Sequence, residues 1–175
     1  VESVHLTKFT GSGQGDELSA FAVGDFNSDG RQDLALGSRS FNYEDFRSNM
    51  GKVYVTFAPF KSGSAESVAD VEIAPYKKSG KETSKLATGR FGQSLSAADG
   101  NLLIGAHGQE DGRAFLVSNF SSDLTWDGFD KEFRPTGERH RHFGRAVAAF
   151  GDMFVVGDPA YSGNDRYGSL SVFNR

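Results

Sequence analysis

Two closely matched units in the sequence restrict this chain to a repeat architecture. Phe91-Gly92 begins one unit, and Phe143-Gly144 begins the other 52 positions later. In each unit an apolar run ends in a glycine 14 positions after the phenylalanine, at Gly105 and at Gly157. Sequence units that recur at roughly this spacing are typical of propellers and solenoids, in which each unit buries its apolar face against the next.

An earlier segment is a third and longer copy. Leu18-Ser19 stands in the place of Phe-Gly, and Gly37 matches the closing glycine 19 positions later. The five additional residues lie in the turn between two short apolar runs, 20–23 and 34–37. The other two copies have tight turns instead, Asp99-Gly100-Asn101 and Gly151-Asp152, which are typical of plain hairpins.

Each copy continues with a strand led by a glycine, at Gly51, Gly112 or Gly168. We expect a fourth strand in the first two copies, within residues 68–74 and 124–129. Four antiparallel strands that recur near fifty residues predict an all-β fold built from β-propeller blades. The innermost strands are rich in Ala, Gly and Ser because blades crowd near the axis, and Phe91 and Phe143 should pack between neighbouring blades.

The predicted organisation is a partial propeller. We assign residues 1–17 to a strand of an adjoining blade, 18–75 to the first blade, 89–130 to the second, and 142–175 to a third that lacks its outer strand. The alternating segment 3–9 is an outer strand either of a preceding blade or of the third. Propellers have about four to eight blades, so three blades form only part of a larger ring. We expect that ring to have seven blades, with a companion polypeptide or domain supplying the rest. Self-assembly with further copies is the alternative.

The long turn of the first copy predicts a calcium site. Asp25, Asn27, Asp29 and Asp33 place side-chain oxygens at alternate positions, and the carbonyl of Arg31 fills the remaining gap. Calcium takes about six to eight oxygen ligands, and a loop of this pattern curls them around one point.

This turn has two other interpretations. An EF-hand loop opens in the same way, but it needs a glutamate at its twelfth position, which here is Leu36, and a helix on each side. The flanks are instead short apolar runs of strand type. The second alternative is an acidic surface turn without metal.

Composition and charge exclude several classes of function but identify none. The chain has 175 residues and a formal net charge of −4, which implies no attraction to nucleic acid or to an anionic membrane. No apolar run is long enough for a transmembrane segment. Cysteine is absent, which excludes disulfides and thiolate chemistry. A calcium loop of this kind and the glycosylation sequon at Asn119 both favour a secreted, extracellular glycoprotein.

These motifs resemble FG-GAP repeats, the blades of integrin α-subunit propellers. The resemblance covers nearly the whole chain and is strongest in the calcium loop. It departs from the pattern at Leu18-Ser19 and in the second and third copies, which lack the loop. The resemblance therefore implies calcium ligands only at five positions of this chain: Asp25, Asn27, Asp29, Arg31 by its carbonyl, and Asp33.

Two protein types with such propellers provide the functional expectations. Glycosylphosphatidylinositol-specific phospholipase D, a secreted hydrolase, is similar in carrying one next to a zinc-dependent catalytic domain. This resemblance implies structural Ca²⁺ in the chain, Zn²⁺ only in a separate segment, and a protein or GPI-anchor ligand. An integrin-like adhesion propeller without enzymatic activity is the alternative.

The sequence predicts no catalytic site within this chain. His140 and His142 could share a strand face and bind a metal, and the run Arg139-His140-Arg141-His142, with Arg134 and Arg145 nearby, could hold an anion such as phosphate. The interpretation favoured for both is structural: a solvated loop between blades for the two histidines, and a basic connector that balances the acidic hairpins for the charged run. Trp126 is either a surface anchor or part of the core.

Overall fold

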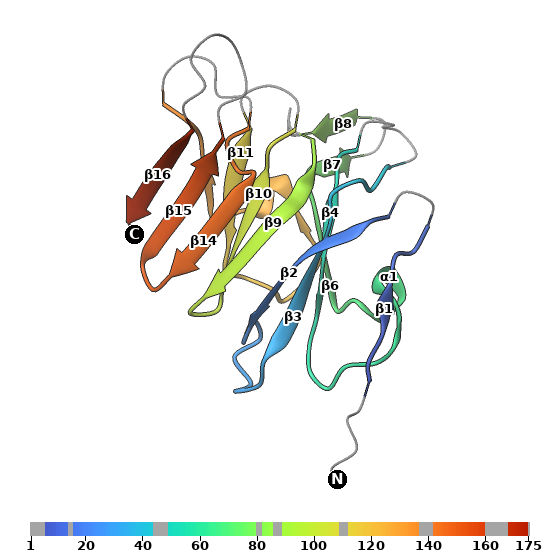
Figure 1. Ribbon diagram of the computed structural model, residues 1–175. Coiled ribbons are helices and arrows are strands. Elements are labelled where there is room, and N and C mark those ends of the chain that lie inside the picture. The colour runs from blue at the N-terminus through green and yellow to red at the C-terminus, as the bar shows by residue number, and fades with distance from the viewer. Residues whose placement is uncertain are drawn as a thin grey trace.

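The computed structural model describes residues 6–13, 16–43, 49–79, 82–85, 89–108, 112–136, 142–159 and 168–174. Three antiparallel sheets lie side by side, and their innermost strands are neighbours along one side of the array (Figure 1). This arrangement confirms the predicted all-β, propeller-like fold, in which each sheet is one blade. The number of blades in a complete ring stays a prediction.

The first blade contains β2 (Leu18–Gly24), β3 (Asp33–Ser38), β4 (Lys52–Thr56) and β6 (Val71–Ala74), paired in that order. The fourth strand expected within residues 68–74 is therefore β6. A short strand from farther along the chain, β12 (Leu124–Thr125), pairs in parallel with the outer edge of β6. The backbone N–H of Glu72 also donates to Asp123 Oδ1 at 2.8 Å, so the second unit holds the edge of the first.

The second blade contains β9 (Phe91–Ala98), β10 (Asn101–Ala106), β11 (Arg113–Val117) and β13 (Lys131–Phe133). The expectation of its outer strand within residues 124–129 was wrong. Leu124 and Thr125 join the first blade instead, and Trp126–Gly128 form the 3₁₀ helix η1. The outer strand is β13, which lies beyond the predicted boundary at residue 130 and pairs Phe133 with Ala114.

The third blade contains β14 (Ala146–Phe150), β15 (Met153–Asp158) and β16 (Ser169–Asn174). Within the described residues, β16 has no strand on its outer side.

The remaining elements lie around the first blade. β1 (Phe9–Thr10) pairs in parallel with β5 (Gly63–Ser64), which leads directly into the single-turn helix α1 (Ala65–Val68). β7 (Tyr76–Ser79) and β8 (Glu82–Lys85) form a hairpin after β6. In the described part of residues 1–17, β1 pairs with β5 of its own chain, and Phe9 packs against the first blade. The assignment of this segment to an adjoining blade stays a prediction. Residues 3–5 of the expected segment lie outside the described residues.

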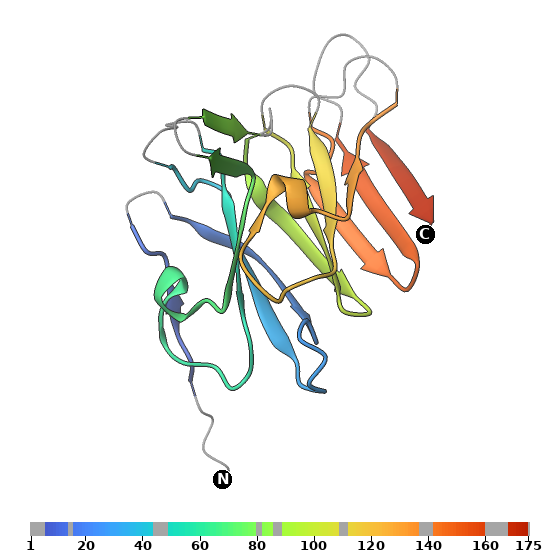
Figure 2. The same cartoon turned by 180° about the vertical axis from the view of Figure 1, so that it is seen from behind.

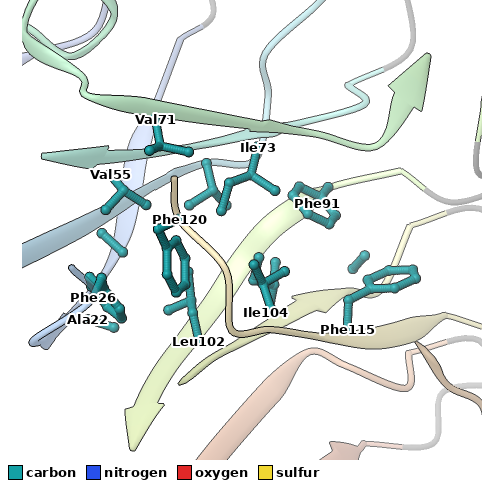
Figure 3. Close-up of a cluster of buried hydrophobic side chains, with 14 residues drawn as sticks. Ala22, Phe26, Val55, Val71, Ile73, Phe91, Leu102, Ile104, Phe115 and Phe120 are labelled. Atoms are coloured by element: carbon teal, nitrogen blue, oxygen red, sulfur yellow. The ribbon is translucent and has the colours of Figure 1, made fainter. Parts of the chain in front are cut away.

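Each junction between blades is filled by apolar side chains from both. The first two blades share the larger cluster, in which Phe91 is fully buried between Ile73 and Phe115 (Figure 3). Phe143 is 1 % exposed in the cluster between the second and third blades. The prediction that these two phenylalanines pack between blades is confirmed. A third, smaller cluster joins Leu36 and Tyr54 to Ala65 of α1.

The three inner hairpins, β2–β3, β9–β10 and β14–β15, turn at the same end of the array (Figures 1 and 2). Neighbouring turns lie close together: a Cβ on Gly100 would be 3.4 Å from the carbonyl oxygen of Asp25. The candidate calcium loop is therefore the first of a row of turns, and the row is held by the packing of the blades behind it.

Two leucine truncations test where the core lies. Leu103 is fully buried between the second and third blades, whereas Leu170 on β16 is 75 % exposed. Leu103→Ala should lower the free energy of unfolding in urea by about 2–5 kcal/mol, because it leaves a cavity in a packed core. The same change at Leu170 should cost less than about 1 kcal/mol. Equal losses would contradict the assignment of these two faces.

Candidate functional site

The candidate site is the loop of residues 25–33, which joins β2 to β3. Gly24 pairs with Asp33, so the loop closes directly on the last rung of the hairpin. Ser28 and Gly30 have positive φ angles of 60° and 84°. Two residues in the left-handed region let the backbone curl within a few positions, and glycine adopts that conformation without steric cost.

The side-chain oxygens of the loop are directed at its own backbone amides. The N–H of Asp29 donates to Asp25 Oδ1 at 3.1 Å and to Asn27 Oδ1 at 3.0 Å, which brings these two oxygens to the same amide. The second oxygen of Asp25 accepts from Gly30 N–H at 2.9 Å, and Asp29 Oδ1 accepts from Arg31 N–H at 2.8 Å. These bonds gather three of the five predicted ligands within one turn.

Asp33 is placed differently, at the buried base of the loop. Its side chain is fully buried, and its Oδ2 accepts from the backbone amides of Phe26 at 2.8 Å and Asn27 at 3.3 Å. Its Oδ1 accepts from the amide of Ala58 at 3.0 Å, just after β4. One carboxylate therefore joins the loop to the third strand of the blade. Phe26 packs on Phe120 at 4.8 Å between ring centroids, which ties the loop to the core.

The donor set of the loop matches calcium in chemistry, since carboxylate, amide and carbonyl oxygens are the ligands this cation prefers. Asp25, Asn27 and Asp29 lie together, with the backbone of Arg31 bonded to Asp29. Among the described residues, no three histidine or acidic side chains are grouped closely enough to hold a metal ion as they stand. Calcium binding by the five residues thus stays a prediction.

The corresponding turns of the other blades lack this oxygen-rich loop. Asp99 and Gly100 have φ angles of 49° and 72° in the turn between β9 and β10. Two consecutive positive φ angles are characteristic of the tight hairpin turns that match the twist of a sheet. The expectation of plain hairpins here agrees with the structure.

The described histidines that come together are His107 and His142, whose ring centroids are 5.6 Å apart. His107 is 4 % exposed, and its Nε2 lies 3.3 Å from Arg90 Nη1. Burial, with the added effect of the positive charges of Arg90, His142 and Arg145, lowers the pKa of His107 to about 4. The packing of the second and third blades makes this pair, which no sequence spacing indicates. His5 and the proposed partner His140 lie outside the described residues.

Other polar and charged side chains of the blades and connectors have structural partners or lie outside the described residues. Arg134 makes a two-point contact with Glu132, at 3.0 and 3.1 Å, so it is held by a carboxylate. Asp70 accepts from the amide of Phe57 at 2.7 Å, and Glu72 pairs with Lys52 at 2.9 Å. Glu110, Asp111, Arg139 and Arg141 are not among the described residues, and the side chain of Trp126 is not described either. Asn119 of the sequon is exposed.

Comparison with known families identifies one repeat in the chain. Residues 18–56 match the FG-GAP repeat family. The match spans β2, the candidate calcium loop, β3 and β4, and it supports the FG-GAP-type repeat expected there. No curated protein matches the chain. In the part of the chain that the structure describes, no helix is long and apolar enough to cross a membrane.

Asp33 should matter for folding even without metal. Asp33→Ala leaves three backbone amides without their acceptor, one of them in the buried interior. We expect a loss of about 3 kcal/mol in the free energy of unfolding, measured by urea denaturation with a chelator present. Asp29→Ala, at an exposed position of the same loop, should cost less than about 1 kcal/mol under these conditions. Similar losses would refute the structural role of Asp33.

Acid should destabilise the chain through His107. The imidazole has a pKa of about 4 when folded against an ordinary value of 6.5, so the unfolded state takes up the proton first. The contribution of neutral His107 to the free energy of unfolding is therefore fully present above about pH 6.5. It falls by about 2–3 kcal/mol as the pH drops toward 4. His107→Gln should flatten this part of the profile in urea denaturation from pH 7.5 to 4. An unchanged slope in the variant would assign the acid sensitivity to other groups.

Proposed function

We propose that this chain is a calcium-binding, non-catalytic segment of an extracellular propeller that serves as a scaffold and recognition surface. The observation that carries the proposal is the loop at residues 25–33. It lies inside the matched FG-GAP repeat, and its Asp25 and Asn27 oxygens meet at the amide of Asp29. The arrangement holds oxygen donors of the type that calcium selects.

Calcium would act here on stability. Asp25, Asn27, Asp29, the carbonyl of Arg31 and Asp33 would hold the ion at the end of the first hairpin. Asp33 already joins this loop to Ala58 beyond β4, so an ion held by the same residues would stiffen a connection that runs across three strands. A structural metal adds stability in proportion to the logarithm of its concentration above the dissociation constant.

The finer assignment is to a phospholipase of the glycosylphosphatidylinositol-specific type, with zinc-dependent hydrolysis in a separate segment. On this assignment the chain contributes stability and recognition, and a companion polypeptide or domain supplies the remaining blades. The FG-GAP match supports an extracellular propeller, and the exposed Asn119 is consistent with its glycosylation. The integrin-like alternative shares the same repeat. A zinc-binding companion favours the first assignment, and a β-subunit companion without hydrolase activity favours the second.

Calcium titration tests the proposal directly. At free Ca²⁺ ten times the dissociation constant, the free energy of unfolding should rise by about 1.4 kcal/mol over the chelated protein. Asp29→Ala should lose most of this increment because it removes a ligand. Asp99→Ala, in the plain turn of the second blade, is the matched control and should keep it. A melting temperature of the natural chain that does not respond to calcium would overturn the proposal.

A further inference from the structure

Basic side chains from separate connectors gather at the end of the array that is opposite the inner hairpin turns (Figure 1). They are Arg39 after β3, Arg90 before β9, His107 after β10, and His142 and Arg145 before β14. Burial, and then the positive charges of the other four, lower the pKa of His107. The cluster is therefore a set of positive charges around one buried imidazole.

The packing of the second blade on the third brings these connectors to the end of β10. The amide of the residue after His107 donates to the carbonyl of the residue before Arg90 at 2.9 Å. On the other side, a Cβ on Gly105 would lie 2.0 Å from the carbonyl oxygen of Gly144, the residue before Arg145. Backbone contacts that flank His107 thus fix where both arginines begin.

Arg90 is held in a backbone conformation that few residues other than glycine adopt. Its φ angle is 59°, in the left-handed region. Its N–H donates to the carbonyl of Asn49 at 2.7 Å, and its carbonyl accepts from the N–H of Gln93 at 3.1 Å. The side chain is held as well, with Nη1 3.3 Å from Nε2 of His107. A guanidinium that is already positioned loses less conformational freedom when it binds a ligand.

The contact with Arg90 also determines where His107 carries its proton. A guanidinium only donates hydrogen bonds, so Nε2 of the neutral imidazole accepts and the proton lies on Nδ1. His107 is 4 % exposed, and its Nδ1 has no hydrogen-bond partner among the described residues. Buried polar groups in folded proteins are nearly always paired. This N–H is therefore a donor for which the described residues supply no acceptor.

Arg90 and Arg145 are also without a counter-charge in the described part of the chain. Both are exposed, and no described carboxylate forms an ion pair with either. In contrast, Arg39 pairs with Glu17 at 3.2 Å. A buried donor beside two uncompensated guanidinium groups matches a ligand that carries negative charge on several acceptor atoms.

We propose that Arg90, Arg145 and the pair of His107 and His142 bind an oxyanion of the phosphate or sulfate type. Guanidinium groups bind such anions through paired, charge-assisted N–H donors. The donors come from three connectors around the end of β10, so they suit a tetrahedral anion with oxygens on several sides better than a planar carboxylate. The site goes beyond the calcium-dependent role proposed above and does not depend on it.

The same charges argue against a metal ion at the two histidines. Their ring centroids are 5.6 Å apart, so the pair resembles half of a transition-metal site. The guanidinium groups of Arg90 and Arg145 would repel a cation there, whereas they attract an anion. The electrostatics of the cluster therefore select the sign of the ligand.

NMR spectra of the histidine rings test the site in the full chain, prepared free of calcium by dialysis. At pH 7 the ring of His107 should show the tautomer protonated at Nδ1, and inorganic phosphate should shift its signals saturably. Sulfate should act in the same way, and acetate at equal ionic strength should not. A His107 ring that ignores phosphate would overturn the proposal, and an equal response to acetate would overturn the ligand class.

Single substitutions locate the bound ion and separate it from a general effect of charge. Arg90→Gln and Arg145→Gln should each weaken phosphate binding by about tenfold or more, because each removes a charge-assisted hydrogen bond. Arg134→Gln is the matched control, since it removes the same charge from a side chain that Glu132 already holds. It should keep the natural affinity. Equal losses in all three variants would overturn the assignment.

Glycerol phosphate distinguishes the source of the anion. Binding as tight as that of inorganic phosphate indicates a site open to phosphate esters of larger molecules, and exclusion of the ester indicates a free ion. Both results require the site. The calcium proposal fails on a melting temperature that ignores calcium, whereas this proposal fails on histidine rings that ignore phosphate, so the two failures are distinguishable.

Discussion

The fold depends on the close approach of backbones at the blade junctions. Gly105 and Gly112 allow the oxygens of Gly144 and Phe143 to lie where a side chain would otherwise be. Because the backbones meet there, the apolar residues on facing strands can interdigitate into continuous clusters on either side of the second blade. A single methyl group at such a position would push two sheets apart, and the loss would extend to every contact in the cluster.

The same tight packing determines where the candidate calcium loop lies. The inner hairpins are aligned by the junctions behind them, so their turns form a row at one end of the array (Figure 1). In that row the first turn is enlarged, and Asp33 at its base connects it to the backbone beyond β4. The residues that would bind calcium and the residues that complete the blade are therefore partly the same. Metal binding and folding are coupled wherever a ligand also satisfies buried backbone amides.

Much of this architecture could be predicted from the sequence because it is repeated and periodic. The equal spacing of Phe91 to Gly105 and of Phe143 to Gly157 predicted the blades. The packing of the two phenylalanines between neighbouring blades was predicted from the same repeat. The assignment of residues 124–129 to an outer strand failed because apolar content shows that a segment is buried without showing in which sheet. Leu124 is partly buried against the blade before its own, and a two-residue parallel pairing has no periodicity that could indicate its partner.

The candidate site shows a similar division. The alternation of Asp25, Asn27 and Asp29 predicted oxygens around one point, and the structure brings these three together through the amide of Asp29. In the sequence pattern, Asp33 is one more predicted calcium ligand, equivalent to Asp25 and Asp29. Its full burial and its bond to Ala58 depend on the return of β4 beside β3, which lies outside the pattern of the loop. The pair of His107 and His142 likewise arises from contact between blades.

The sequence by itself determined the repeat, its strands and the composition of the loop, since spacing, turn residues and oxygen-bearing side chains are local properties of a chain. Only the tertiary structure decided which sheet each short outer strand joins, which carboxylate is buried, and which glycines face a neighbouring backbone. These features depend on distances between segments that are far apart in the chain. They are set by the packing of one blade on another, which the one-dimensional pattern does not contain.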